Sequence, residues 1–183
     1  MAEAVRLGEA ARGHTAPNPN VGCVIVLGNK IVGQGATAPG GRPHAEAVSL
    51  ELAGKKAKGA TLYTTLEPCA HASTRGPTCS ALIPEAGIAR VVIGIMDPDP
   101  RTAGDGISML KKAGIAVRTG IGKEAARDSI SGYLSRIERG RPRITLKLAL
   151  SIDGKIALPS GESKWITGED ARRHVHLLSL IHI

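Results

Sequence analysis

The sequence has no phenylalanine, one tryptophan and two tyrosines among its 183 residues. Proteins that bind single-stranded nucleic acid usually stack bases on aromatic side chains along a groove. The scarcity of aromatic residues therefore argues against this class, although the net charge of +8 raises the question. Part of that charge is concentrated between residues 136 and 147, which hold five basic side chains against Glu138: Arg136, Arg139, Arg141, Arg143 and Lys147. We interpret this segment as a solvated linker and expect no nucleic-acid partner.

Long apolar runs are also absent, because no stretch approaches the roughly eighteen residues that a membrane-spanning helix needs. The opening sequence MAEAVRLGEAARG lacks an apolar core of the length found in secretory signal peptides. Cysteine is scarce, and three cysteines do not make a disulfide framework. These absences predict a cytoplasmic protein without a membrane partner, whose cysteines are either core residues or metal ligands.

The order of apolar segments predicts strands that alternate with helices. Strands are expected as a hairpin over 21–27 and 30–35 and then over 60–66, 90–96 and 115–120. Helices are expected over 2–12, 44–53, 77–87, 106–114 and 123–137, with the third bent or shortened by Pro84. This alternation predicts an α/β domain with a largely parallel sheet behind the initial hairpin.

A domain boundary is predicted near Gly140, where the sequence RGRP interrupts the alternation. The first domain would span residues 1–140 and the second residues 141–183. After the boundary, ITLKLALSIDGKIAL is expected to form a strand that runs into a turn at Asp153 and Gly154.

Four residues could supply metal chemistry. Catalytic zinc sites use three protein ligands and leave a fourth position for water, which ionises near neutral pH when zinc is bound. His44, Cys69 and Cys79 would supply such a set, and Pro68 places Cys69 at the end of an expected strand, near the next helical segment. Glu46 lies two residues after His44, so on a helix the two would not share a face, and Glu46 suits a proton shuttle rather than a ligand.

Each of these residues also has an ordinary interpretation, because a lone histidine on a helix and two isolated cysteines are usually surface and core residues. The combination favours the metal site: H-x-E on a helix, then P-C at a strand end and a further cysteine, is the pattern of zinc nucleobase deaminases. Cys23 lies among valine and isoleucine and is assigned to the core. A zinc-stabilised nucleic-acid binder is the competing class, but three ligands with an acid beside them favour catalysis.

Longer stretches carry a family resemblance. TAPNPNVGCVIV, HAEAVSL, GATLYTTLEPCAH and DPDPRTAGDGISMLKKAGIAV resemble the deaminase domain of the bifunctional riboflavin-biosynthesis deaminase–reductase family. GRPRITLKLALSIDGKIALPSGESKWITGEDAR resembles the beginning of that family's dihydrofolate-reductase-like reductase domain. The resemblance implies a cytidine-deaminase-like three-layer α/β/α sandwich with a mixed sheet over 1–140, followed by an incomplete reductase fragment over 141–183.

The resemblance also implies a reaction, the hydrolytic deamination of 2,5-diamino-6-(5-phosphoribosylamino)pyrimidin-4-one to 5-amino-6-(5-phosphoribosylamino)uracil with release of ammonia. One zinc ion per chain would be held by His44, Cys69 and Cys79, with Glu46 as the proton shuttle, and the protein would be a homo-oligomer. The alternative is a tRNA adenosine or free cytidine deaminase. Nine residues between the two cysteines, the scarce aromatics and the reductase-like continuation argue against it.

Three further residues match substrate-contacting positions of that family. Asn18 lies in the sequence PNP, and Arg75, between the two cysteines, matches a position that faces the phosphate. A guanidinium suits this role because its planar fork of donors fits phosphate oxygens. Asp97, in the sequence DPDP, lies at an expected strand end where substrate contacts occur in the family.

In the reductase-like part, Ala149, Ser163 and Trp165 match cofactor- and substrate-binding positions of the family's NADPH-dependent reductase. A reductase domain needs far more chain than residues 141–183, and position 179 is a serine where the family pattern has an arginine. The sequence therefore predicts a truncated reductase that does not bind NADPH productively. It also predicts that the ending LSLIHI is foreign to the domain.

Overall fold

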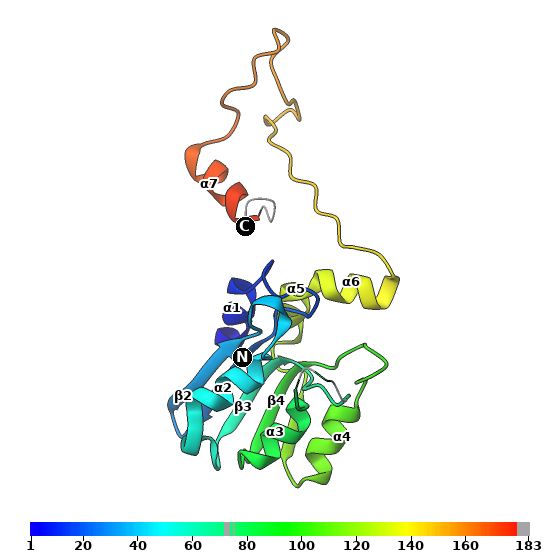
Figure 1. The fold of residues 1–183 in the computed structure, drawn as a ribbon. Coiled ribbons are helices and arrows are strands. Elements are labelled where there is room, and N and C mark those ends of the chain that lie inside the picture. The colour runs from blue at the N-terminus through cyan, green and yellow to red at the C-terminus, as the bar shows by residue number, and fades with distance from the viewer. Residues whose placement is uncertain (72–73, 75, 179–183) are drawn as a thin grey trace. The chain divides into compact units, whose positions relative to one another are not determined.

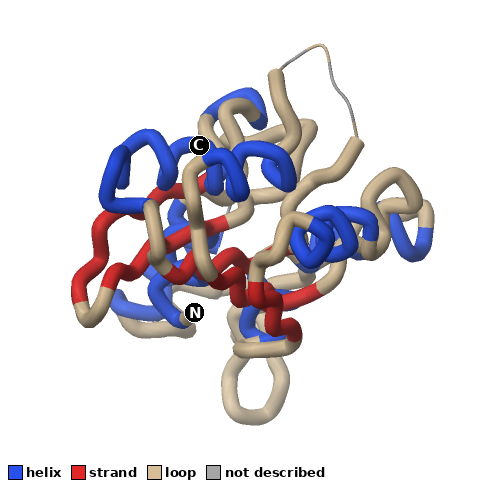
Figure 2. The backbone as a smooth tube through the Cα atoms, turned by 90° about the horizontal axis from the view of Figure 1, so that it is seen from below, coloured by secondary structure: helices blue, strands red, loops and turns tan. Residues whose placement is uncertain are grey.

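The chain divides into two compact units, Met1–Arg143 and Ile144–Ile183, and the computed structural model describes residues 1–71, 74 and 76–178. The first unit contains five strands: β1 (Gly22–Leu27), β2 (Lys30–Ala36), β3 (Thr61–Leu66), β4 (Arg90–Ile95) and β5 (Ala116–Thr119). They form one sheet (Figures 1 and 2). Its strand order is β2-β1-β3-β4-β5. β1 is antiparallel to β2 and β3, whereas β3, β4 and β5 are parallel to one another. The predicted hairpin with parallel strands behind it is confirmed.

Helices cover both faces of this sheet. The first unit has α1 (Ala2–Ala10), α2 (Ala45–Ala53), α3 (Cys79–Glu85), α4 (Asp105–Lys112), α5 (Lys123–Ser129) and α6 (Ser131–Arg139), with short 3-10 turns at Pro39–Gly41 and Gly54–Ala57. α1 packs with α5 against β1 and β4, while α2, α3 and α4 form a second helical layer (Figure 1). The fold class predicted from the sequence, a three-layer α/β/α sandwich with a mixed sheet, is therefore confirmed.

Two glycines let helices approach the sheet closely on its opposite faces. A Cβ atom at Gly22 of β1 would lie 1.8 Å from the Ala4 carbonyl oxygen of α1. A Cβ atom at Gly33 of β2 would lie 2.2 Å from the Ser49 carbonyl oxygen of α2. Any side chain at either position would therefore push a helix away from the sheet.

The core is made of aliphatic side chains from the strands and from the inner faces of the helices. Its largest fully buried hydrophobic members are Ile25, Leu62, Ile83, Ile93, Leu110 and Ile130. Cys23 is also fully buried and belongs to the same core cluster, as its setting in the sequence suggested. This core lies on both sides of the sheet and holds the strand ends that carry the site.

The single helix expected over 123–137 is wrong, because α5 and α6 are separated at Ile130, whose backbone has φ −114° and ψ 22°. Ser129 Oγ donates a hydrogen bond to the Ala126 carbonyl, and Ser131 Oγ donates one to the Asp128 carbonyl, each at 2.8 Å. Side-chain bonds of this kind compete with helical ones. Ile130 is 1% exposed, so the break turns its side chain into the core, and α6 begins in a new direction (Figure 1).

The second unit contains α7 (Glu169–Leu178), which the sequence patterns did not indicate. The strand expected from residue 144 is wrong, since the described residues of this unit include no strand. An isolated apolar segment has no neighbouring strand to accept its backbone hydrogen bonds. Instead Ile144 and Leu146 are 87% and 79% exposed. The expected turn is present, because the Gly154 amide donates to the Ser151 carbonyl at 3.0 Å.

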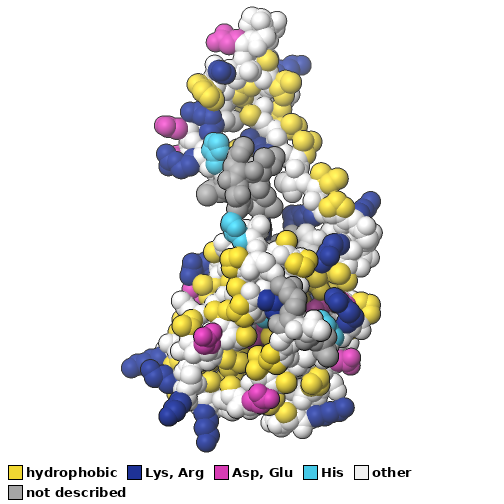
Figure 3. Space-filling view, viewed as in Figure 1, with side chains coloured by type: hydrophobic (Ala, Val, Ile, Leu, Met, Phe, Trp, Pro, Cys, Tyr) yellow, Lys and Arg dark blue, Asp and Glu magenta, His cyan; other side chains and the backbone are white. Residues whose placement is uncertain are grey.

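Within the described ranges, no helix is long and apolar enough to cross a membrane. On the face seen in Figure 3, lysine and arginine side chains are spread along the edges and are interspersed with acidic and apolar ones.

Candidate active site

The three expected metal ligands meet where β3 ends and where α2 and α3 begin. His44 immediately precedes α2, Cys69 follows β3, and Cys79 is the first residue of α3. The ligand atoms His44 Nδ1, Cys69 Sγ and Cys79 Sγ all lie within 4.8 Å of one another. His44 Nδ1 is 3.5 Å from Cys69 Sγ and 3.4 Å from Cys79 Sγ. The structure thus brings together three side chains that are far apart in the sequence.

The protonation of the two thiols favours metal binding. A hydrogen bond from the Cys79 thiol, supported by His44, lowers the pKa of the Cys69 thiol to about 4 against the opposing effect of burial. The same hydrogen bond, together with burial, raises the pKa of Cys79. One nitrogen and two sulfur donors at this separation fit a zinc ion, whose catalytic sites use three such ligands. Binding would release the proton that remains on Cys79, since zinc takes thiolates.

Two premises of the sequence argument need correction. His44 is not helical, because its backbone is extended, with φ −72° and ψ 159°, and α2 begins only at Ala45. Cys69 is not near a helix start along the chain, since α3 begins ten residues later at Cys79. In space, however, the Cys79 amide donates to Cys69 Sγ at 3.4 Å. Cys69 therefore does face the amino end of a helix, but of one that follows an intervening loop.

Glu46 lies beside the cluster on the first turn of α2 and is 3% exposed. Its Oε2 lies 3.4 Å from Cys79 Sγ, and its Oε1 accepts a hydrogen bond from Thr64 Oγ1 at 3.3 Å. Burial raises the pKa of this carboxyl above its usual value. A carboxyl group whose pKa is raised can exchange a proton closer to neutral pH, which general acid–base catalysis requires.

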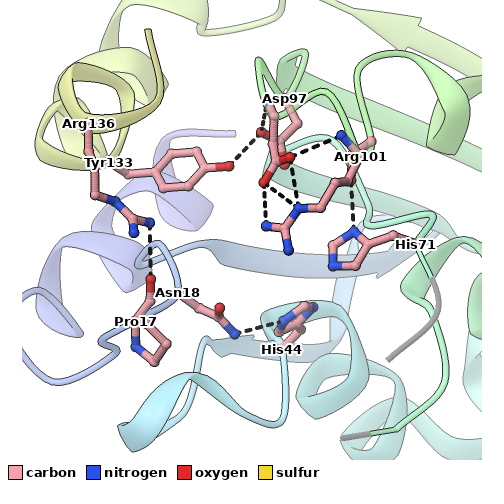
Figure 4. Close-up of polar contacts among 10 residues, drawn as sticks. Pro17, Asn18, His44, His71, Asp97, Arg101, Tyr133 and Arg136 are labelled. Carbon is pink, nitrogen blue, oxygen red and sulfur yellow. Dashed lines mark hydrogen bonds and ion pairs between the residues drawn. The ribbon is translucent and has the colours of Figure 1, made fainter. Parts of the chain in front are cut away.

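Asn18 approaches the cluster from the side opposite the cysteines. Its Nδ2 lies 3.2 Å from His44 Nε2 (Figure 4). The same Nδ2 donates a hydrogen bond to the Gly41 carbonyl at 2.7 Å. Gly41 has φ +84°, and a Cβ atom there would lie 2.9 Å from Asn18 Nδ2. Only glycine adopts this backbone and leaves room for the amide. Asn18 is therefore held beside His44 Nε2, whereas both cysteines lie beside Nδ1 of the same ring.

A cavity of about 360 Å³ opens beside His44. Its lining includes three arginines and two aspartates along with His44: Pro17, Asn18, Pro19, Arg42, His44, His71, Asp97, Asp99, Arg101, Tyr133 and Arg136. Both Asn18 and Asp97, the sequence-predicted substrate contacts within the described residues, belong to this lining (Figure 4). Arg75 lies outside the described residues. The cavity is of the size usual for small-molecule sites.

The two aspartates are fixed by the turn that follows β4. The Asp99 amide donates to Asp97 Oδ1 at 3.0 Å, and the Arg101 amide and Nε both donate to Asp99 Oδ1 at 3.0 Å. The hydrogen bonds from Arg101 lower the pKa of Asp99 to about 2, whereas burial raises that of Asp97. Arg101 was not anticipated from the sequence, although it immediately follows the motif DPDP.

Glu67, which sequence reasoning also missed, connects this turn to the cysteine loop. It is 3% exposed and precedes Pro68 and Cys69. Its carboxylate accepts three backbone N–H bonds, from Asp97 at 3.1 Å, Gly104 at 3.1 Å and Ile107 at 3.0 Å. The only signal in the sequence was its position next to the Pro-Cys pair.

Replacing Glu67 by alanine is expected to lower the free energy of unfolding by at least about 3 kcal/mol, because three backbone donors lose their acceptor. Urea denaturation of the zinc-saturated protein measures this change. Glu51→Ala is the matched control, because Glu51 is exposed on α2. Equal stability of the two variants would contradict the role assigned to Glu67.

The residues assigned to the reductase remnant lie in the second unit. Trp165 is 70% exposed, and the Arg172 guanidinium lies 4.3 Å from the centre of its ring. A cavity of about 500 Å³ lies between Ser151 and Ile166, but Ala149, Ser163 and Trp165 are not in its lining. The structure does not bring these three residues together in this cavity.

Comparisons with known proteins agree with the geometry. The family model described as the cytidine and deoxycytidylate deaminase zinc-binding region matches residues 1–95. The model of the RibD C-terminal domain matches residues 142–180. The chain is similar to riboflavin biosynthesis protein RibD of Escherichia coli (strain K12), with 51% identity over 178 residues that cover 97% of this chain and 48% of that protein.

Solved structures of similar proteins have the same fold as this chain. Acinetobacter baumannii RibD, form 1, superposes with a TM-score of 0.85 at 45% identity, covering 99% of this chain and 51% of that one. The Thermotoga maritima diaminohydroxyphosphoribosylaminopyrimidine deaminase/5-amino-6-(5-phosphoribosylamino)uracil reductase superposes with a TM-score of 0.89 at 40% identity, covering 97% and 51%. The chain spans about half the length of the curated relatives it matches. The family resemblance drawn from the sequence motifs is confirmed.

Proposed function

Because the chain belongs to the cytidine and deoxycytidylate deaminase family with its zinc-binding region, we propose that it hydrolytically deaminates a phosphorylated pyrimidine of riboflavin biosynthesis. The substrate would be 2,5-diamino-6-(5-phosphoribosylamino)pyrimidin-4-one, and the products 5-amino-6-(5-phosphoribosylamino)uracil and ammonia. The observation that carries this proposal is the cluster of His44, Cys69 and Cys79 with Glu46 at its side. His44 belongs both to this cluster and to the lining of the charged cavity.

We propose one zinc ion per chain, held by His44, Cys69 and Cys79. Zinc, when bound, is a Lewis acid that makes a water molecule reactive at neutral pH. The water oxygen forms a bond to the ring carbon that carries the amino group, and the bond from that carbon to the amino nitrogen breaks. Glu46 takes the two protons of the water in turn and delivers one to the neighbouring ring nitrogen and one to the departing nitrogen, so that ammonia leaves and a carbonyl remains.

The cavity suits a substrate that carries both hydrogen-bonding groups and a phosphate. Asn18 and Asp97 offer an amide and a carboxylate to the pyrimidine or the ribosyl part, and the guanidinium groups of Arg42, Arg101 and Arg136 lie in the same lining. Guanidinium groups bind phosphate through charge-assisted hydrogen bonds. The assignment of Arg75 to the phosphate stays a proposal from the sequence.

Ammonia release is the direct test. Zinc-loaded protein should release ammonia from the diaminopyrimidine ribosyl phosphate with a higher kcat/KM than from cytidine or from adenosine in tRNA. Efficient turnover of cytidine or of tRNA, with none of the diaminopyrimidine, would overturn the proposal in favour of the alternative deaminases.

The Arg101→Gln variant tests phosphate recognition. In the wild type, Arg101 Nε donates a hydrogen bond to Asp99, which holds the guanidinium in place at the cavity. Loss of a charge-assisted hydrogen bond should raise KM for the phosphorylated substrate by about tenfold. The dephosphorylated riboside should show a change of less than about twofold, because it lacks the group that Arg101 would bind.

Arg6→Gln provides the matched control for this experiment. Arg6 pairs with Glu3 on the exposed side of α1 and does not line the cavity. Its KM for both substrates should equal that of the wild type. An equal rise of KM for both substrates in Arg101→Gln would show that Arg101 does not bind the phosphate.

The other sequence-based expectations stay predictions. These are a reductase part that does not use NADPH at Ala149, Ser163 and Trp165, a homo-oligomeric state and a cytoplasmic location.

A further inference from the structure

Helix α6 supplies two side chains to the cavity, although it lies outside the strands and loops that carry the metal cluster. The Tyr133 hydroxyl donates a hydrogen bond to Asp97 Oδ1 at 2.7 Å, which joins residues 36 positions apart (Figure 4). Arg136 Nη2 donates a hydrogen bond to the Pro17 carbonyl at 3.3 Å, and these two residues are 119 positions apart in the sequence. Residues three apart on a helix share one face, so a single face of α6 contacts both sides of the cavity.

One contact reaches a sequence-predicted substrate residue, and the other reaches the residue next to a second one. Asp97 is itself the target of Tyr133, and Pro17 immediately precedes Asn18, whose amide lies beside His44. The Arg136 guanidinium also lies 5.8 Å from the centre of the Tyr133 ring. α6 therefore holds the Asp97 turn and the Asn18 loop at a defined separation across the cavity.

The hydrogen bonds to Asp97 are unevenly distributed. Among the described residues, the Tyr133 hydroxyl and the Asp99 amide donate hydrogen bonds to this carboxylate, and Oδ1 accepts both. Oδ2 thus keeps its capacity to accept a hydrogen bond from an N–H or O–H group in the cavity. Burial and the neighbouring Asp97 raise the pKa of Tyr133, so its phenol stays protonated and remains a donor.

We propose that Tyr133 is a positioning residue, whose hydroxyl orients the Asp97 carboxylate so that it accepts a hydrogen bond from an amino or hydroxyl group of the substrate. This inference rests on the proposed function, because that substrate class carries ring amino groups and ribosyl hydroxyls. A carboxylate already held by two donors on one oxygen loses less rotational freedom when the substrate binds to the other oxygen. Without the phenol hydroxyl, only the Asp99 amide holds Oδ1, and the substrate must supply more of the ordering of the carboxylate.

The Tyr133→Phe variant tests this role because it removes the hydroxyl and keeps the ring. KM for the diaminopyrimidine ribosyl phosphate should rise by about tenfold, with kcat changed by less than about twofold, since a ground-state contact is weakened. Zinc content and the thermal midpoint should stay at wild-type values. Calorimetric titration of the zinc-loaded Glu46→Gln protein with the same substrate should show a similar loss of affinity when Tyr133→Phe is added.

The other tyrosine gives the matched control. Tyr63 is on β3 and does not line the cavity, so Tyr63→Phe should leave KM unchanged. In an Asp97→Ala background, Tyr133→Phe should add less than about a twofold change, because the hydroxyl has lost its partner. A purely structural role of Tyr133 would persist in that background and would lower the thermal midpoint.

An unchanged KM in Tyr133→Phe, or a rise of the same size on the Asp97→Ala background, would overturn the inference. If Asp97→Ala does not fold, the comparison of Tyr133→Phe with Tyr63→Phe still decides. Wild-type protein that releases no ammonia from the diaminopyrimidine would instead overturn the proposed function itself. An active wild type with an unaltered Tyr133→Phe variant overturns only the positioning role.

Discussion

Replacing Glu46 by glutamine is expected to leave zinc bound and to lower kcat by about 10²- to 10⁴-fold, the usual contribution of a general acid–base group. Glutamine has nearly the same shape and can still accept the hydrogen bond from Thr64 Oγ1. It cannot take up a proton from water and deliver it to the departing amine. Ammonia release and metal analysis on the same preparation would measure both quantities.

Glu51→Gln is the matched control, because Glu51 lies on the same helix but is exposed to solvent. Its kcat should be that of the wild type. If Glu46→Gln retained wild-type turnover, Glu46 would not be the proton shuttle. If it lost zinc together with activity, the carboxylate would be acting as a ligand or as a support for one.

Replacing Cys69 by alanine is expected to weaken zinc binding by more than about 100-fold. Removing a residue that only hydrogen-bonds to a zinc ligand already lowers metal affinity by about 10- to 100-fold, and Cys69 is itself a proposed ligand. Only His44 and Cys79 would then remain, and catalytic zinc sites need three protein ligands. Ammonia release should fall to background. Dialysis against a zinc-buffered chelator followed by metal analysis gives the affinity.

Cys23→Ala separates ligation from the general effects of removing a cysteine. Cys23 is fully buried in β1, so its replacement leaves a small cavity and costs some stability. The Cys23→Ala protein should nevertheless bind about one zinc ion per chain, because the Cys23 sulfur is not part of the ligand cluster. Equal zinc loss in Cys23→Ala and Cys69→Ala would show that folding, rather than ligation, explains the result.

The chemistry of the candidate site could be anticipated because few residue types carry it. Histidine, cysteine and glutamate in a short pattern point to a metal and a proton shuttle. Tyr133, Arg101 and Glu67 could not be found in this way. Their roles come from contacts that the fold creates, such as the bond from Tyr133 to a carboxylate 36 residues earlier, and a tyrosine on a helix is most often a packing residue.

The fold likewise has parts that local sequence patterns predict and parts that depend on long-range contacts. Short apolar runs identified the hairpin and the parallel strands, because a run of apolar residues is a local property of the sequence. The break at Ile130 escaped such patterns, since the turn depends on two serine side chains and on a buried position that only the packed core provides. The segment from residue 144 has the pattern of a strand, but a strand also requires a partner for its backbone.

The spacing of the three ligands has a further consequence for folding. Ligation would tie His44 to Cys69 and Cys79, which lie 25 and 35 positions later in the chain. In the chain-entropy description of cross-links, closing a loop of this size raises the free energy of the unfolded chain by about 3.5 to 4 kcal/mol. All three cysteines are free, so zinc would serve as the cross-link of a protein without disulfides. Its removal would loosen His44, which also lines the cavity proposed for the substrate.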